Sequence, residues 1–193
     1  SPIKIGGFLA ALLISIILVT GCTSTATQSA AKYTPDSLPD NIPATNEGQL
    51  MPEGNNVGNK APDFNLTATD GKTLKLSEMT AQGKPVVLYF MTTWCPYCKE
   101  EYANIGKAYP SHGSAELISV SIDLNEDAAM LEEYRTSNKR PGLFAPGDQQ
   151  ILRNYSVLYT TTKYVISRDG TILYKSSGVL STDNWKTIFN SLQ

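Results

Sequence analysis

The sequence has few residues of the kinds that hold metals or build disulfide scaffolds, and it carries little net charge of either sign. Its 193 residues include only three cysteines and one histidine. These are too few for a disulfide-stapled fold, and too few for a closed four-ligand zinc site unless carboxylates contribute. The 16 basic residues nearly balance the 18 acidic ones, which gives a net charge of −2. Nucleic-acid binding, which depends on concentrated positive charge, is therefore not expected.

Long apolar runs are also scarce, and the stretch at residues 5–19 is short for a transmembrane helix. It follows Lys4 and fits the apolar region of a secretory signal. The next residues, Val19-Thr20-Gly21-Cys22, are similar to a bacterial lipobox, in which the cysteine is lipidated and becomes the mature N-terminus. We therefore expect residues 1–22 to be a lipoprotein signal, with Cys22 anchoring the chain to the extracytoplasmic face of a bacterial membrane. An uncleaved anchor helix is the alternative.

The stretch at residues 23–60 has few large apolar residues and no periodic pattern. It is rich in Ser, Thr, Ala, Asn, Pro and Gly. This composition predicts a flexible linker, whose reach would be about 35 Å. The folded domain is then expected to span residues 61–193.

The apolar pattern of this domain alternates between strand and helix periods. We expect strands near residues 63–67, 73–76, 86–91, 117–122, 143–145, 164–166 and 172–174. We expect helices near residues 95–109, 127–135, 149–155 and 181–192, and a short helical turn at 76–79 capped by Ser77. This order predicts an α/β fold, with a central mixed sheet, helices on both faces and an N-terminal β-hairpin.

The pattern Trp94-Cys95-Pro96-Tyr97-Cys98 comes directly after an apolar strand and opens the next helix. A thiol at a helix N-terminus faces unpaired amides and the positive end of the helix dipole, and both stabilise its thiolate. Cys98 lies one helical turn further along, so its sulfur can reach Cys95. The spacing predicts a redox-active pair, in which Cys95 attacks a partner disulfide and Cys98 resolves the mixed disulfide. No other cofactor and no metal are expected.

Several stretches match the motifs of a known family. They are residues 58–66, the Gly-Lys before residues 86–90, the Cys-Pro-Tyr-Cys stretch with the Lys-Glu-Glu after it, and residues 155–157 and 166–170. Through them, residues 58–193 resemble the thioredoxin superfamily, and more narrowly the TlpA/ResA-like membrane-anchored thiol–disulfide oxidoreductases. The resemblance implies a thioredoxin-like fold with an added N-terminal hairpin. It also implies disulfide-containing client proteins and a membrane thiol protein that donates electrons.

The resemblance also assigns roles outside the cysteine pair. Glu101, three residues after Cys98 on the same helical face, corresponds to the acidic residue that handles the proton of the buried thiol. The family's cis-proline loop, which pairs with the substrate chain, corresponds to Thr160 and Thr161, with Thr161 at the proline. A non-proline cis bond costs about 3–4 kcal/mol, so we expect either a trans bond or a strained cis bond before Thr161. The expected client-binding residues are Trp94, Pro96, Tyr97, Thr160 and Thr161.

The leading functional hypothesis is a lipid-anchored oxidoreductase that reduces disulfides of secreted or cytochrome-maturation clients. The reductive direction follows from the family analogy. A thiol peroxidase is an alternative, because Thr92 lies three residues before Cys95, although Leu88 replaces the proline of the peroxiredoxin pattern. A non-catalytic binding module is another, and the intact cysteine pair argues against it. Copper handling by the two cysteines and Met91 is the weakest.

Overall fold

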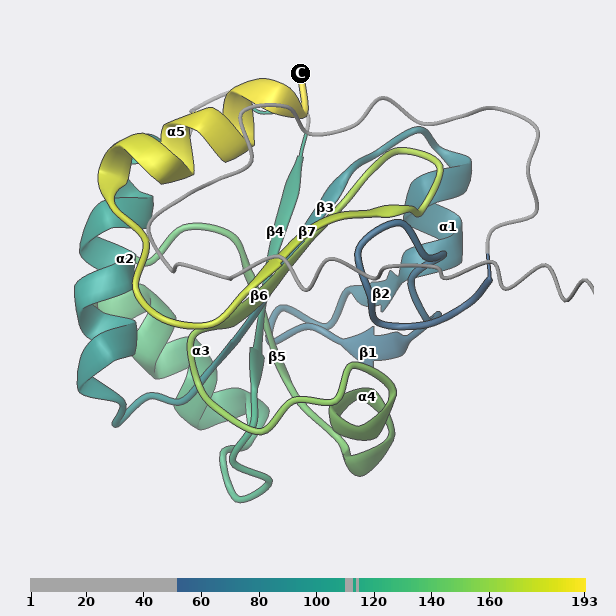
Figure 1. Cartoon of the computed structure of the whole chain (residues 1–193). Coiled ribbons are helices and arrows are strands. Elements are labelled where there is room, and N and C mark those ends of the chain that lie inside the picture. Colours follow the sequence, from purple (N-terminus) through teal and green to yellow (C-terminus); the bar gives the residue numbers. More distant parts are fainter. Residues whose placement is uncertain (1–51, 110–112, 114) are drawn as a thin grey trace, which may run out of the picture. The chain divides into compact units, whose positions relative to one another are not determined.

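The computed structural model describes residues 52–109, 113 and 115–193, and its centre is a five-stranded sheet (Figure 1). The strands are β3 (Val86–Met91), β4 (Glu116–Ser121), β5 (Leu143–Pro146), β6 (Thr162–Ile166) and β7 (Ile172–Ser176). They lie in the order β5-β4-β3-β6-β7. β3, β4 and β5 are parallel, whereas β6 runs antiparallel to β3, and β7 runs antiparallel to β6. The prediction of a mixed sheet is confirmed.

β3 lies in the middle of this sheet and is buried along its whole length. Successive side chains of a strand point to opposite faces, so β3 contributes to an apolar cluster on each face. Val87, Tyr89 and Met91 belong to one cluster, and Val86, Leu88 and Phe90 belong to the other. A strand that is buried on both faces needs a continuous apolar run, and the sequence at 86–91 provides it.

Helices cover both faces of the sheet (Figure 1). The cluster that contains Tyr89 is completed by α2 (Pro96–Ala108), α3 (Ala128–Ser137) and α5 (Thr182–Ser191). The opposite cluster is completed by α1 (Leu76–Ala81), α4 (Gln149–Asn154) and the hairpin of β1 (Asn65–Thr67) and β2 (Thr73–Lys75). Gly71 in the hairpin turn has a φ of 85°, a conformation that favours glycine. The predicted layers and the N-terminal hairpin are therefore confirmed.

Three of the helices begin with a side-chain oxygen as their cap. Asp127, Asp148 and Ser181 cap α3, α4 and α5, and each accepts a hydrogen bond from the amide three residues further on. The prediction that Ser77 caps the first helix is wrong. α1 already begins at Leu76, and the amide of Ser77 donates to Asp63 Oδ1 at 2.9 Å. The Asp63 carboxylate, and not the Ser77 hydroxyl, thus accepts a hydrogen bond from an amide in the first turn of this helix.

The segment before the hairpin lies along the edge strand β7. The amide of Gly58 donates to the Ile172 carbonyl at 2.8 Å, and the amide of Ile172 donates to the Asn59 carbonyl at 2.9 Å. These bonds cover part of a strand edge that would otherwise be open to pairing with another chain. The last residues of the predicted linker 23–60 are therefore packed against the sheet.

The predicted signal segment 1–22, with its lipidated Cys22, lies outside the described residues, and so does most of the predicted linker. Within the part of the chain that the structure describes, no helix has the length and apolar character needed to cross a membrane.

Candidate active site

The two cysteines lie where the loop after β3 enters α2. Cys95 is the N-cap of α2, and its Sγ accepts a hydrogen bond from the amide of Cys98 at 3.2 Å. Pro96 occupies the first turn of the helix, where no amide donor is needed. Both cysteines are free thiols, and their exposed fractions are 2% for Cys95 and 0% for Cys98. The start of α2 therefore brings the two predicted redox thiols together, with Cys98 one turn further into the helix.

The loop that carries these cysteines is held by the β4–α3 connection. Glu126 is buried, and its Oε1 accepts hydrogen bonds from both the amide and the hydroxyl of Thr93. Its Oε2 accepts from Ser121 Oγ at 2.6 Å. The indole Nε1 of Trp94 donates to Asp123 Oδ2 at 3.1 Å. Contacts from another part of the chain thus fix the approach to Cys95, and Glu126 was not among the predicted site residues.

Exposed apolar side chains flank Cys95 on two sides. Trp94 and Tyr97, predicted as client-binding residues, are 63% and 66% exposed, and Pro96 between them is also exposed. Leu158 and Tyr159, which precede the Thr160 loop, are exposed to 78% and 70%, and the sequence prediction did not include them. Cys95 itself is almost fully buried, and the exposed side chains belong to its neighbours in sequence and to residues next to Thr160, which it contacts.

The Thr160–Thr161 segment lies against Cys95. The thiol of Cys95 donates a hydrogen bond to Thr160 Oγ1 at 3.2 Å. No cis peptide bond occurs in the described residues, so the bond before Thr161 is trans. Thr161 takes a φ of 62°, its amide donates to the Phe90 carbonyl at 2.8 Å, and its hydroxyl accepts from the Gly178 amide at 3.0 Å. Of the two expectations for this bond, the structure thus has the trans one.

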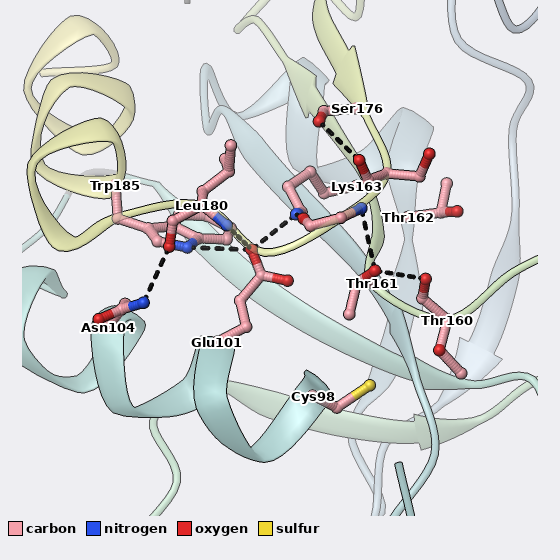
Figure 2. Close-up of polar contacts among 12 residues, drawn as sticks. Cys98, Glu101, Asn104, Thr160, Thr161, Thr162, Lys163, Ser176, Leu180 and Trp185 are labelled. Atoms are coloured by element: carbon pink, nitrogen blue, oxygen red, sulfur yellow. Dashed lines mark hydrogen bonds and ion pairs between the residues drawn. The ribbon is translucent and has the colours of Figure 1, made fainter. Parts of the chain in front are cut away.

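Glu101 points into the domain from α2 and is fully buried, whereas its neighbour Glu100 is exposed. Its Oε1 accepts three hydrogen bonds, from Lys163 Nζ at 2.6 Å, the Leu180 amide at 3.1 Å and Trp185 Nε1 at 3.2 Å (Figure 2). These donors come from β6, from the loop before α5, and from α5 itself. Three segments of the C-terminal half therefore meet at the carboxylate that follows Cys98 by one turn.

Burial dominates the proton equilibria of this site. It raises the pKa of Cys98 to about 11, and the hydrogen bond with Cys95 adds to the rise. Burial also raises the pKa of Glu101, while the charge and hydrogen bond of Lys163 act against that rise. Tyr89, packed beside them, keeps its proton because burial raises its pKa well above the usual value. At neutral pH Cys98 is thus a thiol, and its reaction needs a group that takes the proton.

Lys163 is the most conspicuous site residue that sequence reasoning missed. It lies within β6 and is completely buried. The signal for it is a single lysine inside the strand Thr162–Ile166, whose other residues are also buried. Buried lysines are rare unless they are paired, so that position indicates a buried acidic partner, although the sequence does not say which one.

Comparison with known proteins places the chain in a family. Residues 57–175 match the model of the AhpC/TSA family. The chain is 29% identical over 128 residues to the thiol-disulfide oxidoreductase ResA of Bacillus subtilis, which covers 64% of this chain and 69% of that protein. It is 27% identical over 124 residues to ResA of Bacillus thuringiensis, covering 63% of this chain and 70% of the relative.

Solved structures agree on the fold. StoA from Bacillus subtilis superposes with a TM-score of 0.54 at 20% identity, over 66% of this chain and 96% of its own. The thioredoxin domain of a thiol-disulfide oxidoreductase from Bacteroides vulgatus gives a TM-score of 0.60 at 18% identity, over 72% and 99%. The fold is thus thioredoxin-like, as predicted. Because the family model spans more than half of the chain, the chain belongs to the AhpC/TSA family, as a TlpA/ResA-like member of the thioredoxin superfamily.

Proposed function

We propose that the protein is a thiol–disulfide oxidoreductase in which Cys95 and Cys98 alternate between a dithiol and a disulfide. The observation that carries this proposal is the position of both thiols at the start of α2, with the Cys98 amide donating to Cys95 Sγ at 3.2 Å. The amide donor stabilises the negative charge that Cys95 Sγ carries during disulfide exchange. The ResA proteins that this chain resembles are named thiol-disulfide oxidoreductases, which supports the same reaction.

The proposed reaction has two exchange steps. The Cys95 thiolate attacks one sulfur of a client disulfide, so that a Cys95–client disulfide forms and the other client sulfur leaves as a thiolate, which takes up a proton. Cys98 then loses its proton and attacks Cys95 Sγ. The Cys95–Cys98 disulfide forms, and the second client sulfur leaves as a thiolate that is also protonated. The client disulfide gains two electrons, and the cysteine pair loses them.

Glu101 is the proposed acceptor of the Cys98 proton. It lies one turn after Cys98 on α2, and both side chains are fully buried. Because burial raises the pKa of Cys98 to about 11, the thiol does not ionise unaided at neutral pH. A buried carboxylate beside it can take the proton as the sulfur attacks.

The proposed clients are disulfide-bearing proteins outside the cytoplasm, including proteins of cytochrome maturation, and the proposed direction is reduction. Exposed Trp94 and Tyr97 would contact the client chain, together with the Thr160–Thr161 loop that lies on the Cys95 thiol. The Cys95–Cys98 disulfide would be the only redox group. A membrane thiol protein would return it to the dithiol form.

The reduction potential of the cysteine pair tests this function and its direction. The oxidised and reduced forms are equilibrated with thiol buffers of known potential, and their ratio is read by alkylation and mass spectrometry. We expect a potential nearer to about −270 mV, as in thioredoxin, than to about −120 mV, as in a disulfide-forming oxidase. A value close to the latter contradicts the reductive assignment. Faster reaction with hydrogen peroxide than with disulfides would favour the thiol peroxidase alternative.

We further propose that Cys22 carries the lipid that anchors the protein to the membrane. Support comes from the apolar run at residues 5–19 and the Val-Thr-Gly-Cys stretch that follows it. Two or more acyl chains suffice for stable anchoring. The wild-type protein should therefore sediment with membranes and carry the mass of attached acyl chains, whereas Cys22→Ser should lose the acyl mass. Equal masses, after allowance for the substitution, would argue for an uncleaved anchor helix.

A further inference from the structure

The one fully buried ion pair among the described residues lies directly behind the cysteine pair. Lys163 Nζ is 2.6 Å from Glu101 Oε1, and both side chains are 0% exposed. The ammonium also donates to the carbonyl of Gly178. The other ion pairs in this part of the chain join residues three apart in sequence, and all of their side chains are partly exposed. A buried pair of this kind is costly to desolvate and adds little to stability, so its position beside a reactive thiol calls for a chemical explanation.

The two carboxylate oxygens of Glu101 differ in their hydrogen bonding. Oε1 accepts from Lys163, the Leu180 amide and Trp185, which uses its hydrogen-bonding capacity. Oε2 is buried and accepts no hydrogen bond of normal geometry from the described residues, while the neighbouring Tyr89 hydroxyl acts on the carboxylate and lowers the pKa of Glu101. In Figure 2 this second oxygen points away from Trp185, toward the side on which Cys98 lies. The carboxylate is thus clamped through one oxygen, and the other is left for a proton.

From these contacts, and on the basis of the function proposed above, we propose that Lys163 is a positioning residue for proton transfer from Cys98. It holds Glu101 as a carboxylate with Oε2 turned toward the thiol. When Cys98 reacts, its proton moves from Sγ to Glu101 Oε2, and the sulfur attacks Cys95 Sγ. Lys163 keeps its own proton throughout and stays bound to Oε1.

The charges around the pair support this assignment. Glu101 faces Lys163 from β6, Tyr89 from β3 and the uncharged indole of Trp185 from α5. Tyr89 also faces Cys98. Lys163 faces the rings of Tyr89 and Trp185, at 5.9 Å and 5.7 Å from their centroids. Lys163 is therefore the only cation among these neighbours.

The Lys163 ammonium lowers the pKa of Glu101, so its removal should raise that pKa. Burial raises the pKa of Glu101, and the ammonium of Lys163 opposes that rise. Without the ammonium, Glu101 holds a proton to higher pH, and a protonated carboxyl cannot accept the proton of Cys98. The charges of Lys163 and the Cys98 thiolate also attract each other, which raises the pKa of Lys163 against the effect of burial. Loss of the lysine should therefore move the resolving step to higher pH.

Lys163 also connects the carboxylate to the loop that lies on Cys95. Its ammonium binds the Gly178 carbonyl, while the Gly178 amide donates to Thr161 Oγ1 at 3.0 Å. Gly178, in the loop before α5, is thus bonded both to the Glu101 counterion and to the proposed client-binding segment. The proton acceptor and the client loop share an anchor, so their positions are set together.

The test is the pH profile of the resolving step in Lys163→Met, made in the full chain with Cys22→Ser so that only the two active-site thiols remain. The reduced protein is mixed with oxidised glutathione, and aliquots are acid-quenched. Mass spectrometry then separates the Cys95–glutathione adduct from the Cys95–Cys98 disulfide. We expect the midpoint of the resolution rate to rise by at least about one pH unit, which slows the step about tenfold at pH 7. At high pH the two rates should converge.

Lys175→Met is the matched control. Lys175 lies on the neighbouring strand β7, and its Nζ contacts the Asn55 carbonyl and the ring of Tyr164 instead of Glu101. Its profile should coincide with that of the wild type. If Lys163→Met gives the wild-type profile as well, the proposed role is wrong. If the wild-type chain forms no Cys95–Cys98 disulfide at any pH, it is the proposed function that fails.

A double variant covers the case in which Lys163→Met does not fold because it leaves Glu101 without a counterion. Lys163→Met combined with Glu101→Gln removes both buried charges. The proposal requires the pH profile of this double variant to differ from that of Glu101→Gln by much less than the shift of about one pH unit expected of Lys163→Met, since only the attraction between Lys163 and the Cys98 thiolate acts without the carboxylate. A purely structural lysine would instead slow the double variant further by a factor that does not depend on pH, and that result would overturn the proposal.

Discussion

The Cys95→Ser variant is expected to lose disulfide exchange with clients by about a thousandfold or more, because it removes the group that attacks the client sulfur. The Cys98→Ser variant is expected to behave differently. It should react once and then remain joined to its client through Cys95, since the second thiol that releases the client is missing.

The asymmetry between the two thiols follows from their surroundings. Cys95 caps α2, its sulfur accepts the Cys98 amide, and it lies between exposed Trp94 and Tyr97. Cys98 is fully enclosed, and burial raises its pKa to about 11. A client disulfide can therefore reach Cys95 first, whereas Cys98 can attack only the sulfur of its neighbour.

Insulin serves as a model client for this pair of variants, with Cys22→Ser in every chain so that the third cysteine cannot react. Turnover is followed in the presence of dithiothreitol, and trapped adducts are identified on non-reducing gels and by mass spectrometry. Adducts on Cys95→Ser and none on Cys98→Ser would reverse the assigned roles. Wild-type turnover in both variants would leave only a non-catalytic binding module.

The position of the cysteine pair could be predicted from sequence because the patterns that indicate it are local. A continuous apolar run at 86–91 predicts a buried strand, and a Cys-x-x-Cys stretch with Pro96 inside it predicts a helix N-terminus that carries two thiols. Strand, turn and helix adjoin in the chain, so no knowledge of the tertiary fold is needed to place Cys95 and Cys98. The same holds for the start of α5, which the sequence predicted near residue 181 and which Ser181 caps.

The surroundings of the site could not be predicted in this way, because they come from distant parts of the chain. Glu101 meets Lys163, 62 residues further on, and Trp185, 84 residues further on. Glu126 fixes Thr93 from 33 residues away. The sequence shows that each of these residues is polar or aromatic, but only the sheet order and the packing of α5 on α2 determine which of them meet.

Thr161→Pro is expected to destabilise the fold by about 3 kcal/mol or more, even though proline is the residue that the family has at this position. Thr161 has a φ of 62°, whereas proline is restricted to about −65°. Proline also lacks the amide that donates to the Phe90 carbonyl at 2.8 Å, and it removes the hydroxyl that accepts from Gly178. The measurement is urea unfolding followed by far-ultraviolet circular dichroism, with midpoint and slope compared to the wild type.

Thr161→Gly is the matched control for the backbone. Glycine adopts a positive φ without the cost that a side chain incurs there, and it keeps the amide that binds Phe90. The relief of backbone strain and the loss of the Gly178 hydrogen bond should nearly cancel, so we expect a change of less than about 1 kcal/mol. A comparable loss in both variants would mean that the threonine side chain, and not its backbone conformation, is what the loop requires.

The opposite outcome for Thr161→Pro would be equally informative. A proline variant with wild-type stability and faster reaction with clients would show that the loop can take up the conformation of its relatives. The contacts argue against this, because three properties of Thr161 are in use at once. Its backbone angle shapes the loop, its amide ties the loop to β3, and its hydroxyl ties it to Gly178, which also binds the counterion of Glu101. Thr161→Pro introduces the residue that the family has at this position. In this chain it nevertheless breaks the contacts that fix the client loop relative to the proton acceptor.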